Sequence, residues 1–142
     1  ISIDGLAFPL TSLEVKSNQN TRIIWTSPNT WLAISTKEDF IKIIKENCNS
    51  ENFSVTDISH SRAIICIKGP KAKEVLKKGC PLNFNEYKKN KCAGSVFHGI
   101  TIFVDCLSEE SLEFNLLTLR SFGESLYHHI TDAALEFGYL GE

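Results

Sequence analysis

The chain has 142 residues, of which 42% are hydrophobic and 23% are charged, and its formal net charge is −2. This length is enough for one domain with its own hydrophobic core, and the balanced charge excludes a strong attraction to nucleic acid or an anionic membrane. No apolar stretch approaches the roughly 20 residues that a membrane-spanning helix needs, and no signal peptide is visible. We therefore predict a single domain spanning residues 1–142, with no nucleic-acid or membrane partner.

The cysteines favour a reducing, cytoplasmic setting. Their number is odd, which argues against a closed disulfide framework, and no Cys-x-x-Cys pair provides the usual zinc spacing. The histidines are scattered along the chain, so no metal site is predicted. Reduced thiols are the ordinary state in cytoplasmic proteins. The five cysteines are Cys48, Cys66, Cys80, Cys92 and Cys106.

The first part of the chain predicts an irregular arm followed by a hairpin. Residues 1–20 have weak patterning, whereas residues 22–26 and 31–35 have the pattern of strands joined by a Ser-Pro-Asn-Thr turn. Trp25 and Trp31 flank this turn, and they could form a ligand platform or lie in the core. Alternating strand positions usually hold core aromatic residues, which favours the core.

The next part predicts a helix and two strands. Apolar residues fall on one stripe at helical spacing across residues 36–47, and residues 53–57 alternate as a strand does. Residues 63–67 form an almost unbroken apolar run that is rich in β-branched isoleucine. Such a run is typical of a strand that is buried on both faces.

Three residues mark the turn and the helix that follow this strand. Gly69 and Pro70 end the strand and begin a helix, because proline at the first helical position loses no hydrogen bond. Gly79 is expected to end that helix in a left-handed conformation. Gly69, Pro70 and Gly79 are therefore predicted to be structural turn residues.

The segment before the apolar strand gathers polar groups in a loop, where folds often place recognition residues. Asp57 and Arg62 can form a charge-assisted hydrogen-bonded unit that holds the loop or meets a ligand or partner chain. Ser59 and His60 are adjacent, but neighbouring strand residues point to opposite faces, which disfavours a nucleophile–base pair. No catalytic residue is predicted.

The last part of the chain predicts three strands and a helix. The strands span residues 92–98, 100–107 and 112–119, and the helix spans residues 120–137 and ends at Gly138. Strands and helices thus mix, with an antiparallel run near the C-terminus. This order indicates an α+β fold with a ferredoxin-like βαββαβ core and extra antiparallel strands.

Two further polar regions have alternative interpretations. The lysine-rich residues 83–91 could bind a phosphate or a polyglutamyl tail, but three lysines without interleaved aromatic residues favour a solvated loop. At the start of the last helix, Ser121 could serve the helix N-terminus while Arg120 reaches an acidic neighbour. The same pair could instead meet a partner chain.

The polar loop, the strand and its turn together resemble a known signature. Asp-Ile-Ser-His at residues 57–60, followed by a strand and Gly-Pro at residues 69–70, is similar to the first signature of the folate-dependent aminomethyltransferase superfamily. Gly-Cys-Pro-Leu at residues 79–82 narrows the resemblance to the gamma subunit family of heterotetrameric sarcosine oxidase. Further segments in matching order are residues 24–32, residues 92–93, and residues 120–122 through 136–138.

The resemblance implies an aminomethyltransferase-like fold and a place in an assembly of four kinds of subunit. In that family the assembly oxidatively demethylates sarcosine to glycine, with release of hydrogen peroxide and one-carbon transfer to tetrahydrofolate. FAD, FMN, NAD and tetrahydrofolate are then expected on the larger partner subunits, with the alpha subunit as the main partner and no cofactor on this chain. The absence of a Gly-x-Gly-x-x-Gly motif after a strand agrees with this expectation.

The sequence departs from the folate-binding aminomethyltransferases at one point. These enzymes place an acidic pair in a Gly-Gly-Ile-x-Asp-Asp-like segment, whereas residues 94–105 here contain Asp105 as their single acid. Without its proton-handling acid, such a site loses general acid–base catalysis. We therefore expect a non-catalytic gamma subunit, and the alternatives are a stand-alone folate-binding aminomethyltransferase-like protein and a ferredoxin-like regulatory module. The candidate interface or loop-organising residues are Asp57, Ser59, His60, Arg62, Arg120 and Ser121.

Overall fold

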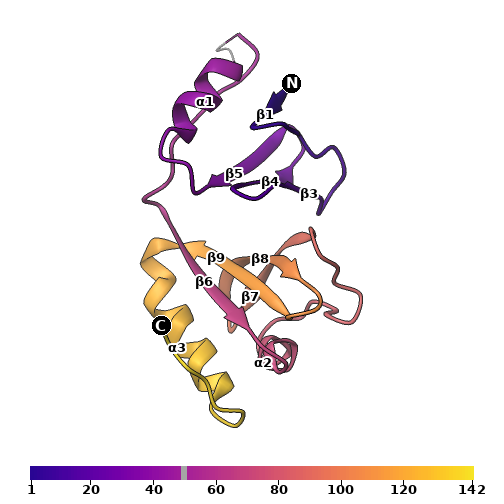
Figure 1. Cartoon of the computed structure of the whole chain (residues 1–142). Helices are drawn as coiled ribbons and strands as arrows, with labels where there is room; N and C mark the ends of the chain where they lie inside the picture. The colour runs from indigo at the N-terminus through magenta and orange to yellow at the C-terminus, as the bar shows by residue number, and fades with distance from the viewer. Residues whose placement is uncertain (49–50) are drawn as a thin grey trace. The chain divides into compact units, whose positions relative to one another are not determined.

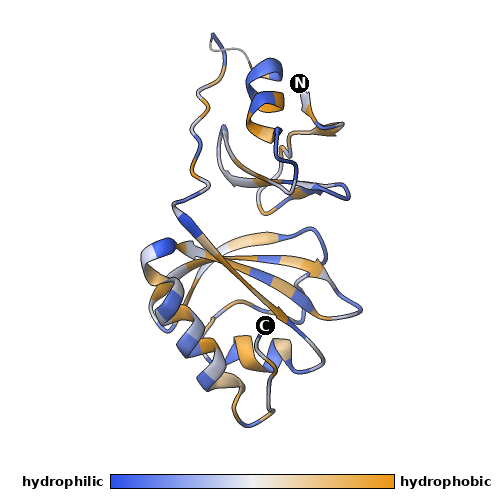
Figure 2. Cartoon of the chain, turned by 60° about the vertical axis from the view of Figure 1, so that its left-hand side comes forward, coloured by the Kyte–Doolittle hydropathy of each residue, from blue (hydrophilic) through white to orange (hydrophobic). Residues whose placement is uncertain are grey.

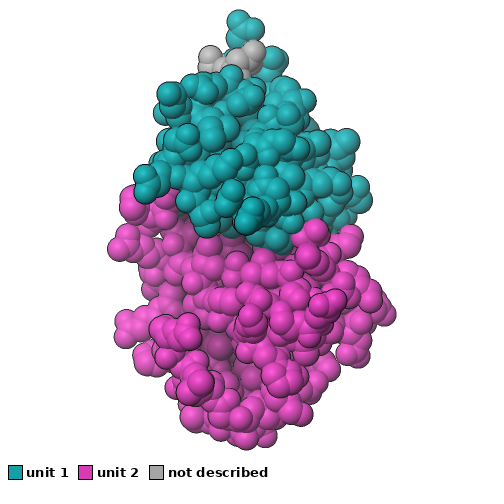
Figure 3. Space-filling model, in the orientation of Figure 1, with its two compact units in different colours: residues 1–58 teal, residues 59–142 magenta. Residues whose placement is uncertain are grey.

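The computed structural model describes residues 1–48 and 51–142. They form two compact units, Ile1–Ile58 and Ser59–Glu142 (Figure 3). Helices and strands are mixed, and every pairing among the described strands is antiparallel. This agrees with the predicted mixture of helices and antiparallel sheets. One domain over residues 1–142 stays a prediction, and the two units are described separately below.

The described residues of the N-terminal unit form five strands and one helix (Figure 1). The strands pair as a β1-β2 hairpin and a three-stranded β3-β4-β5 sheet, in which Trp25 lies opposite Trp31. The elements are β1 (Ser2–Ile3), β2 (Leu6–Ala7), β3 (Val15–Ser17), β4 (Thr21–Ser27), β5 (Thr30–Ser35) and α1 (Phe40–Asn47).

This unit differs from the sequence prediction at three places. Residues 1–20 contain three short strands instead of an irregular arm, because strands of two or three residues are too short to show a period. The helix begins at Phe40 rather than at residue 36, and residues 37–39 form the turn that precedes it. The strand predicted over residues 53–57 is absent, and this segment has no regular secondary structure.

A small apolar cluster forms the core of the N-terminal unit. Ile23 and Phe40 are buried in it, and Trp31 and Phe53 pack against it. The indole N–H of Trp31 donates to the carbonyl of Pro9 at 2.8 Å. Trp31 is therefore a packed core residue whose polar atom is satisfied locally.

The C-terminal unit is a four-stranded sheet in the order β6-β9-β8-β7 with two helices and a short 3₁₀ helix. Its element order is β-α-β-β-β-α, which differs from the predicted βαββαβ core. The difference arises because β8 runs through a short turn into β9, and only helix follows β9. The elements are β6 (Arg62–Lys68), α2 (Ala72–Lys77), β7 (Cys92–Phe97), β8 (Ile100–Ser108), β9 (Glu113–Leu119), η1 (Arg120–Phe122) and α3 (Gly123–Ala134).

The core of this unit lies between the sheet and its helices. Buried apolar side chains from β8, β9, α2 and α3 belong to one cluster, so both helices cover the same face of the sheet. The members that are less than 2% exposed include Leu76, Phe84, Phe97, Ile102, Val104, Phe114, Leu116 and Leu126.

Strand β6 is buried on one face, whereas the sequence predicted burial on both. Figure 2 shows that β6 is hydrophobic along most of its length. Ile65 and Ile67 pack against the core, but Ile64 is 46% exposed and Cys66 is exposed. The reason is that β6 is an edge strand of a sheet whose helices cover a single face.

The turn residues around α2 have different physical roles from one another. Gly69 has φ +133°, a conformation that side-chain-bearing residues rarely adopt. Pro70 lies outside the helix, which begins at Ala72. Gly79 was predicted to be left-handed, but its φ is not positive. A Cβ at this position would lie only 2.8 Å from the His98 imidazole, so glycine is needed for close packing.

Candidate functional site

The two polar regions predicted from sequence lie at the same end of the four-stranded sheet. Arg62 begins β6 and pairs in register with Leu119 at the end of β9. The ladder continues one residue further, because the backbone N–H of Arg120 donates to the carbonyl of Ser61 at 2.9 Å. The fold thus brings Arg62 close to Arg120, although they are distant in sequence.

The other candidate residues of the C-terminal unit are exposed near this end of the sheet. Ser59 and His60 form the turn that leads into β6, and Ser121 lies in η1. Asp57 is exposed at the end of the N-terminal unit.

One side-chain nitrogen of Arg62 is buried and donates no hydrogen bond. Its Nε is buried and has no hydrogen-bond partner, so the predicted unit with Asp57 does not use this atom. The adjacent Ala63 faces α3, because a Cβ at Gly123 would lie 2.9 Å from the Ala63 Cβ. Neighbouring strand residues point to opposite faces, so Arg62 lies on the face opposite α3.

Ser121 does not cap the last helix, in contrast to one of its predicted roles. It is the middle residue of η1, and α3 begins two residues later at Gly123. The N-cap position is Phe122, and no side chain of the described residues caps this end. The hydroxyl of Ser121 is therefore not required by the helix N-terminus.

Asp105, the single acid of residues 94–105, is a buried strand residue. It lies in β8, is 0% exposed, and pairs in register with Cys92 and Asn115. The nearby Tyr87 hydroxyl donates to the carbonyl of Val104 at 2.5 Å, and burial raises the pKa of Tyr87 above its usual range. Neither group resembles a solvent-accessible acid–base pair.

The lysine-rich loop is held by an acidic side chain. Glu109 accepts a hydrogen bond from the backbone N–H of Lys89 at 3.1 Å and pairs with Lys88 at 3.5 Å. The Lys89 N–H and then the Lys88 charge lower the pKa of Glu109. These contacts explain the loop as an anchored surface segment, without an anionic ligand.

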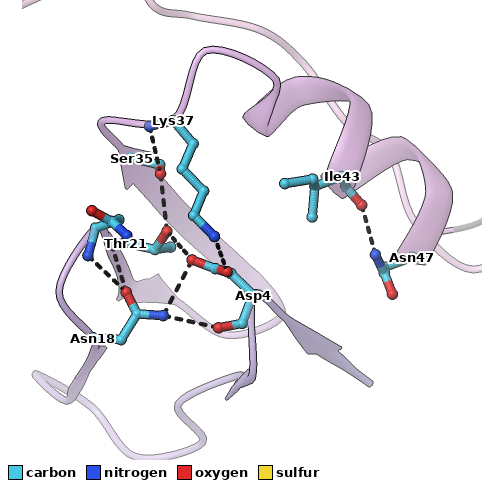
Figure 4. A network of polar contacts seen from close by, with 8 residues as sticks. Asp4, Asn18, Thr21, Ser35, Lys37, Ile43 and Asn47 are labelled. Carbon is cyan, nitrogen blue, oxygen red and sulfur yellow. Dashed lines mark hydrogen bonds and ion pairs between the residues drawn. The ribbon is translucent and has the colours of Figure 1, made fainter.

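Sequence reasoning missed a polar network in the N-terminal unit (Figure 4). The Asp4 carboxylate accepts hydrogen bonds from Lys37, from Thr21 Oγ1 at 2.7 Å and from Asn18 Nδ2 at 3.2 Å. Ser35 Oγ lies 2.9 Å from the Thr21 hydroxyl. The Lys37 hydrogen bond, followed by those of Thr21 and Asn18, lowers the pKa of Asp4 to about 2. The Asp-Gly pair at residues 4–5 was the local sequence feature that could have indicated the turn bearing Asp4, since such pairs favour tight turns.

The described part of the chain contains neither a metal-binding cluster nor a membrane-spanning helix. Over residues 1–48 and 51–142, no three or more His, Cys, Asp or Glu side chains gather as a metal cluster would require. None of the described helices combines the length and the apolar character needed to cross a membrane.

The match to a protein family is extensive. The model of the "Sarcosine oxidase, gamma subunit family" matches residues 2–136. The chain belongs to this family. The match includes both compact units and all six candidate interface residues, and it confirms the resemblance that the sequence segments indicated.

Individual sarcosine oxidase gamma subunits are similar over most of this chain. That of Corynebacterium sp. (strain U-96) is 26% identical over 137 residues, which are 94% of this chain and 66% of the relative. That of Corynebacterium sp. (strain P-1) is 27% identical over 124 residues, which are 85% of this chain and 60% of the relative. The chain thus spans slightly under two thirds of the length of these gamma subunits.

A solved structure has the same fold. A chain of the heterotetrameric sarcosine oxidase from Corynebacterium sp. U-96, in complex with pyrrole 2-carboxylate, superposes with a TM-score of 0.86 and 25% sequence identity. The superposition covers 97% of this chain and 72% of the other.

Proposed function

We propose that this chain is a non-catalytic gamma subunit of a heterotetrameric sarcosine oxidase. The assembly would oxidatively demethylate sarcosine to glycine and transfer the one-carbon unit to tetrahydrofolate. The family match over residues 2–136 is the observation on which this proposal rests. The TM-score of 0.86 to a chain of such an assembly supports it.

We also propose that the fold is aminomethyltransferase-like. The Asp-Ile-Ser-His segment at residues 57–60 leads into β6, and Gly69-Pro70 leads from β6 into α2. The superfamily signature is expected to lie on a strand, a turn and a helix in this order, which supports the proposal.

The non-catalytic role is supported by the state of the acidic groups. Asp105 is 0% exposed, and an acid that cannot reach a substrate cannot exchange a proton with it. FAD, FMN, NAD and tetrahydrofolate are accordingly assigned to the partner subunits, and no residue of this chain is assigned to them. Cysteines that stay as thiols fit a reducing compartment, so we assign the assembly to the cytoplasm.

The proposed docking site is the polar end of the four-stranded sheet, and its proposed partner is the larger alpha subunit. The half-buried Arg62 would donate hydrogen bonds through its guanidinium to a carboxylate or carbonyl of that subunit. Arginines are frequent among the residues that dominate interface energies. Arg120, Ser121, Ser59 and His60 would form the polar rim around it.

Coexpression tests this assignment. The tagged chain, expressed together with the larger subunits of a sarcosine oxidase, is expected to copurify with them as a flavin-coloured complex. Recovery of the chain as a free monomer, with the flavin-containing subunits eluting separately, would contradict the proposal.

A folate titration distinguishes the alternative function. The isolated chain is titrated with tetrahydrofolate in a calorimeter, and no stoichiometric binding is expected. Tight binding of one tetrahydrofolate per chain would instead favour a stand-alone folate-binding aminomethyltransferase-like protein.

A further inference from the structure

Two imidazoles from separate elements meet on the surface of the C-terminal unit. His98 lies in the turn between β7 and β8, and His129 lies on α3. Their ring centroids are 5.2 Å apart and the ring planes are inclined by 32°. Both residues are exposed, so the pair is accessible to a small ligand from solvent.

The His98 ring is held in place by its surroundings. Its backbone N–H donates to the carbonyl of Gly79 at 3.2 Å, and its ring centroid lies 4.8 Å from that of Phe97 in an edge-to-face arrangement. The ring also lies where a side chain at Gly79 would be, since a Cβ there would approach its Cδ2 to 2.8 Å. His98 is thus positioned by packing rather than left free in solvent.

His129 is positioned by the helix that bears it. Its neighbour Ile130 is 6% exposed and belongs to the core cluster, as do Leu126 and Ala133 on the same helix face. An anchored helix fixes the direction in which the adjacent residue leaves the surface. Two ligands on rigid elements lose little conformational entropy when they bind an ion together.

The ring separation fits two imidazoles that share one metal ion. With a metal–nitrogen distance of about 2.0–2.1 Å and a ligand–metal–ligand angle between square and tetrahedral, the two ring centroids lie about 4.5–5.3 Å apart. The observed 5.2 Å falls within this range. Rotation of each ring about its metal–nitrogen bond does not change the distance, so the inclination of 32° is compatible with it.

We propose that His98 and His129 form a two-imidazole binding site for a divalent transition-metal ion such as Zn²⁺ or Ni²⁺. No cluster of three or more His, Cys, Asp or Glu side chains occurs in residues 1–48 and 51–142, so water would complete the coordination. Such a site binds more weakly than a four-ligand structural zinc site, and its ion exchanges with solvent. Imidazole suits nickel, copper and zinc alike.

Metal binding would link the β7–β8 hairpin to α3. The two histidines are distant in sequence and come together only in the folded unit. An ion that binds the folded chain and not the unfolded one raises stability by mass action. The site therefore acts as an exchangeable cross-link, and it does not depend on the proposed role of the chain in an oxidase.

Titration of the full chain with Ni²⁺ tests the site. The background is Cys66→Ser, because Cys66 is an exposed thiol that could bind metal on its own. His98→Gln and His129→Gln each remove one ligand. His128→Gln is the matched control, since His128 is the exposed helical neighbour of His129 but lies 3.7 Å from Glu124. Calorimetry measures affinity, and thermal unfolding measures the stabilisation by the ion.

We expect one Ni²⁺ per chain and a melting temperature that rises with Ni²⁺ concentration. Each ligand variant should bind at least about tenfold more weakly and lose the rise in melting temperature. His128→Gln should match the unmodified background. Equal binding by all variants, or an equal loss in His128→Gln, would overturn the proposal.

An NMR measurement on the background chain needs no ligand variant. Paramagnetic Ni²⁺ at substoichiometric amounts should broaden the imidazole signals of His98 and His129 while those of His60 stay sharp. Equal broadening of the His60 signals would count against a built site.

Discussion

A comparison between Asp4 and Arg62 shows how the two units treat their charged groups. In the N-terminal unit, the Asp4 carboxylate accepts hydrogen bonds from Lys37, Thr21 and Asn18 (Figure 4). In the C-terminal unit, the Nε of Arg62 is buried without a hydrogen bond. Hydrogen bonds to a half-buried carboxylate stabilise the fold around it, whereas a buried donor without an acceptor costs free energy. The hydrogen bonds favour a structural role for Asp4, and the half-buried Arg62 is the proposed partner-binding residue.

The largest expected effect concerns the partner-binding side of this comparison. Arg62→Met keeps most of the side-chain volume but removes the buried donor and the charge. We expect affinity for the larger subunits to fall by about 2 kcal/mol or more, as for other arginines at interface centres. The free energy of unfolding of the isolated chain should not fall, because an unsatisfied donor is removed. Surface plasmon resonance and urea unfolding measure the two quantities.

The control for Arg62→Met is Lys88→Met, which removes a surface charge from the loop of residues 83–91. It should leave affinity for the larger subunits unchanged. If Arg62→Met left affinity unchanged and reduced stability by more than 1 kcal/mol, a structural role for Arg62 would replace the binding role.

The next largest effect is expected at the C-terminal end of β6, where Gly69 has an unusual backbone conformation. Gly69 has φ +133°, and its N–H donates to the carbonyl of Leu112 at 3.2 Å. Gly69→Val should lower the free energy of unfolding by about 1–3 kcal/mol, because valine is strained at this angle. Lys89→Ala should have little effect. Equal melting temperatures for the two variants would contradict the prediction.

A smaller effect is expected within the Asp4 network. Thr21 is 0% exposed, and its hydroxyl lies within hydrogen-bond distance of both Asp4 and Ser35. Thr21→Val should lower the free energy of unfolding by about 1 kcal/mol, the usual net value of such hydrogen bonds. Thr26→Val, on the same strand, is the control, because it removes a single exposed hydrogen bond to the carbonyl of Thr30 at 3.0 Å. Similar losses in both variants would show that the network contributes no more than an ordinary exposed hydrogen bond.

The last prediction concerns acid. The pKa of Asp4 is about 2 in the folded chain, below its ordinary value of 3.8. Its contribution to stability is therefore fully present above about pH 4 and is lost as the pH falls through 2. Urea unfolding from pH 5 to pH 2 should show a smaller acid-dependent loss in Asp4→Asn than in the unmodified chain. Asp39→Asn, an exposed aspartate of the same unit, should retain the full loss.

Local pattern in the sequence was enough to predict β4, β5, β6, the three strands after residue 91 and the presence of the last helix. That helix spans Gly123–Ala134 instead of residues 120–137, because η1 precedes it and a turn follows it. The same pattern, with its order of short segments, indicated the gamma subunit family. Periodicity and turn residues depend on the backbone state of a few neighbouring residues. For the same reason the very short strands β1 to β3 left no detectable signal, and an alternating segment at residues 53–57 was mistaken for a strand.

Tertiary structure alone decided which residues meet. It made β6 an edge strand, so that Ile64 and Cys66 are exposed although the apolar run predicted burial. It gave Gly79 a packing role against His98 in place of the predicted left-handed cap. Contacts of this kind, like the one between Lys37 and Asp4 across 33 residues, depend on strand order and helix placement. Those are set by burial of the whole core, and no local window of sequence contains them.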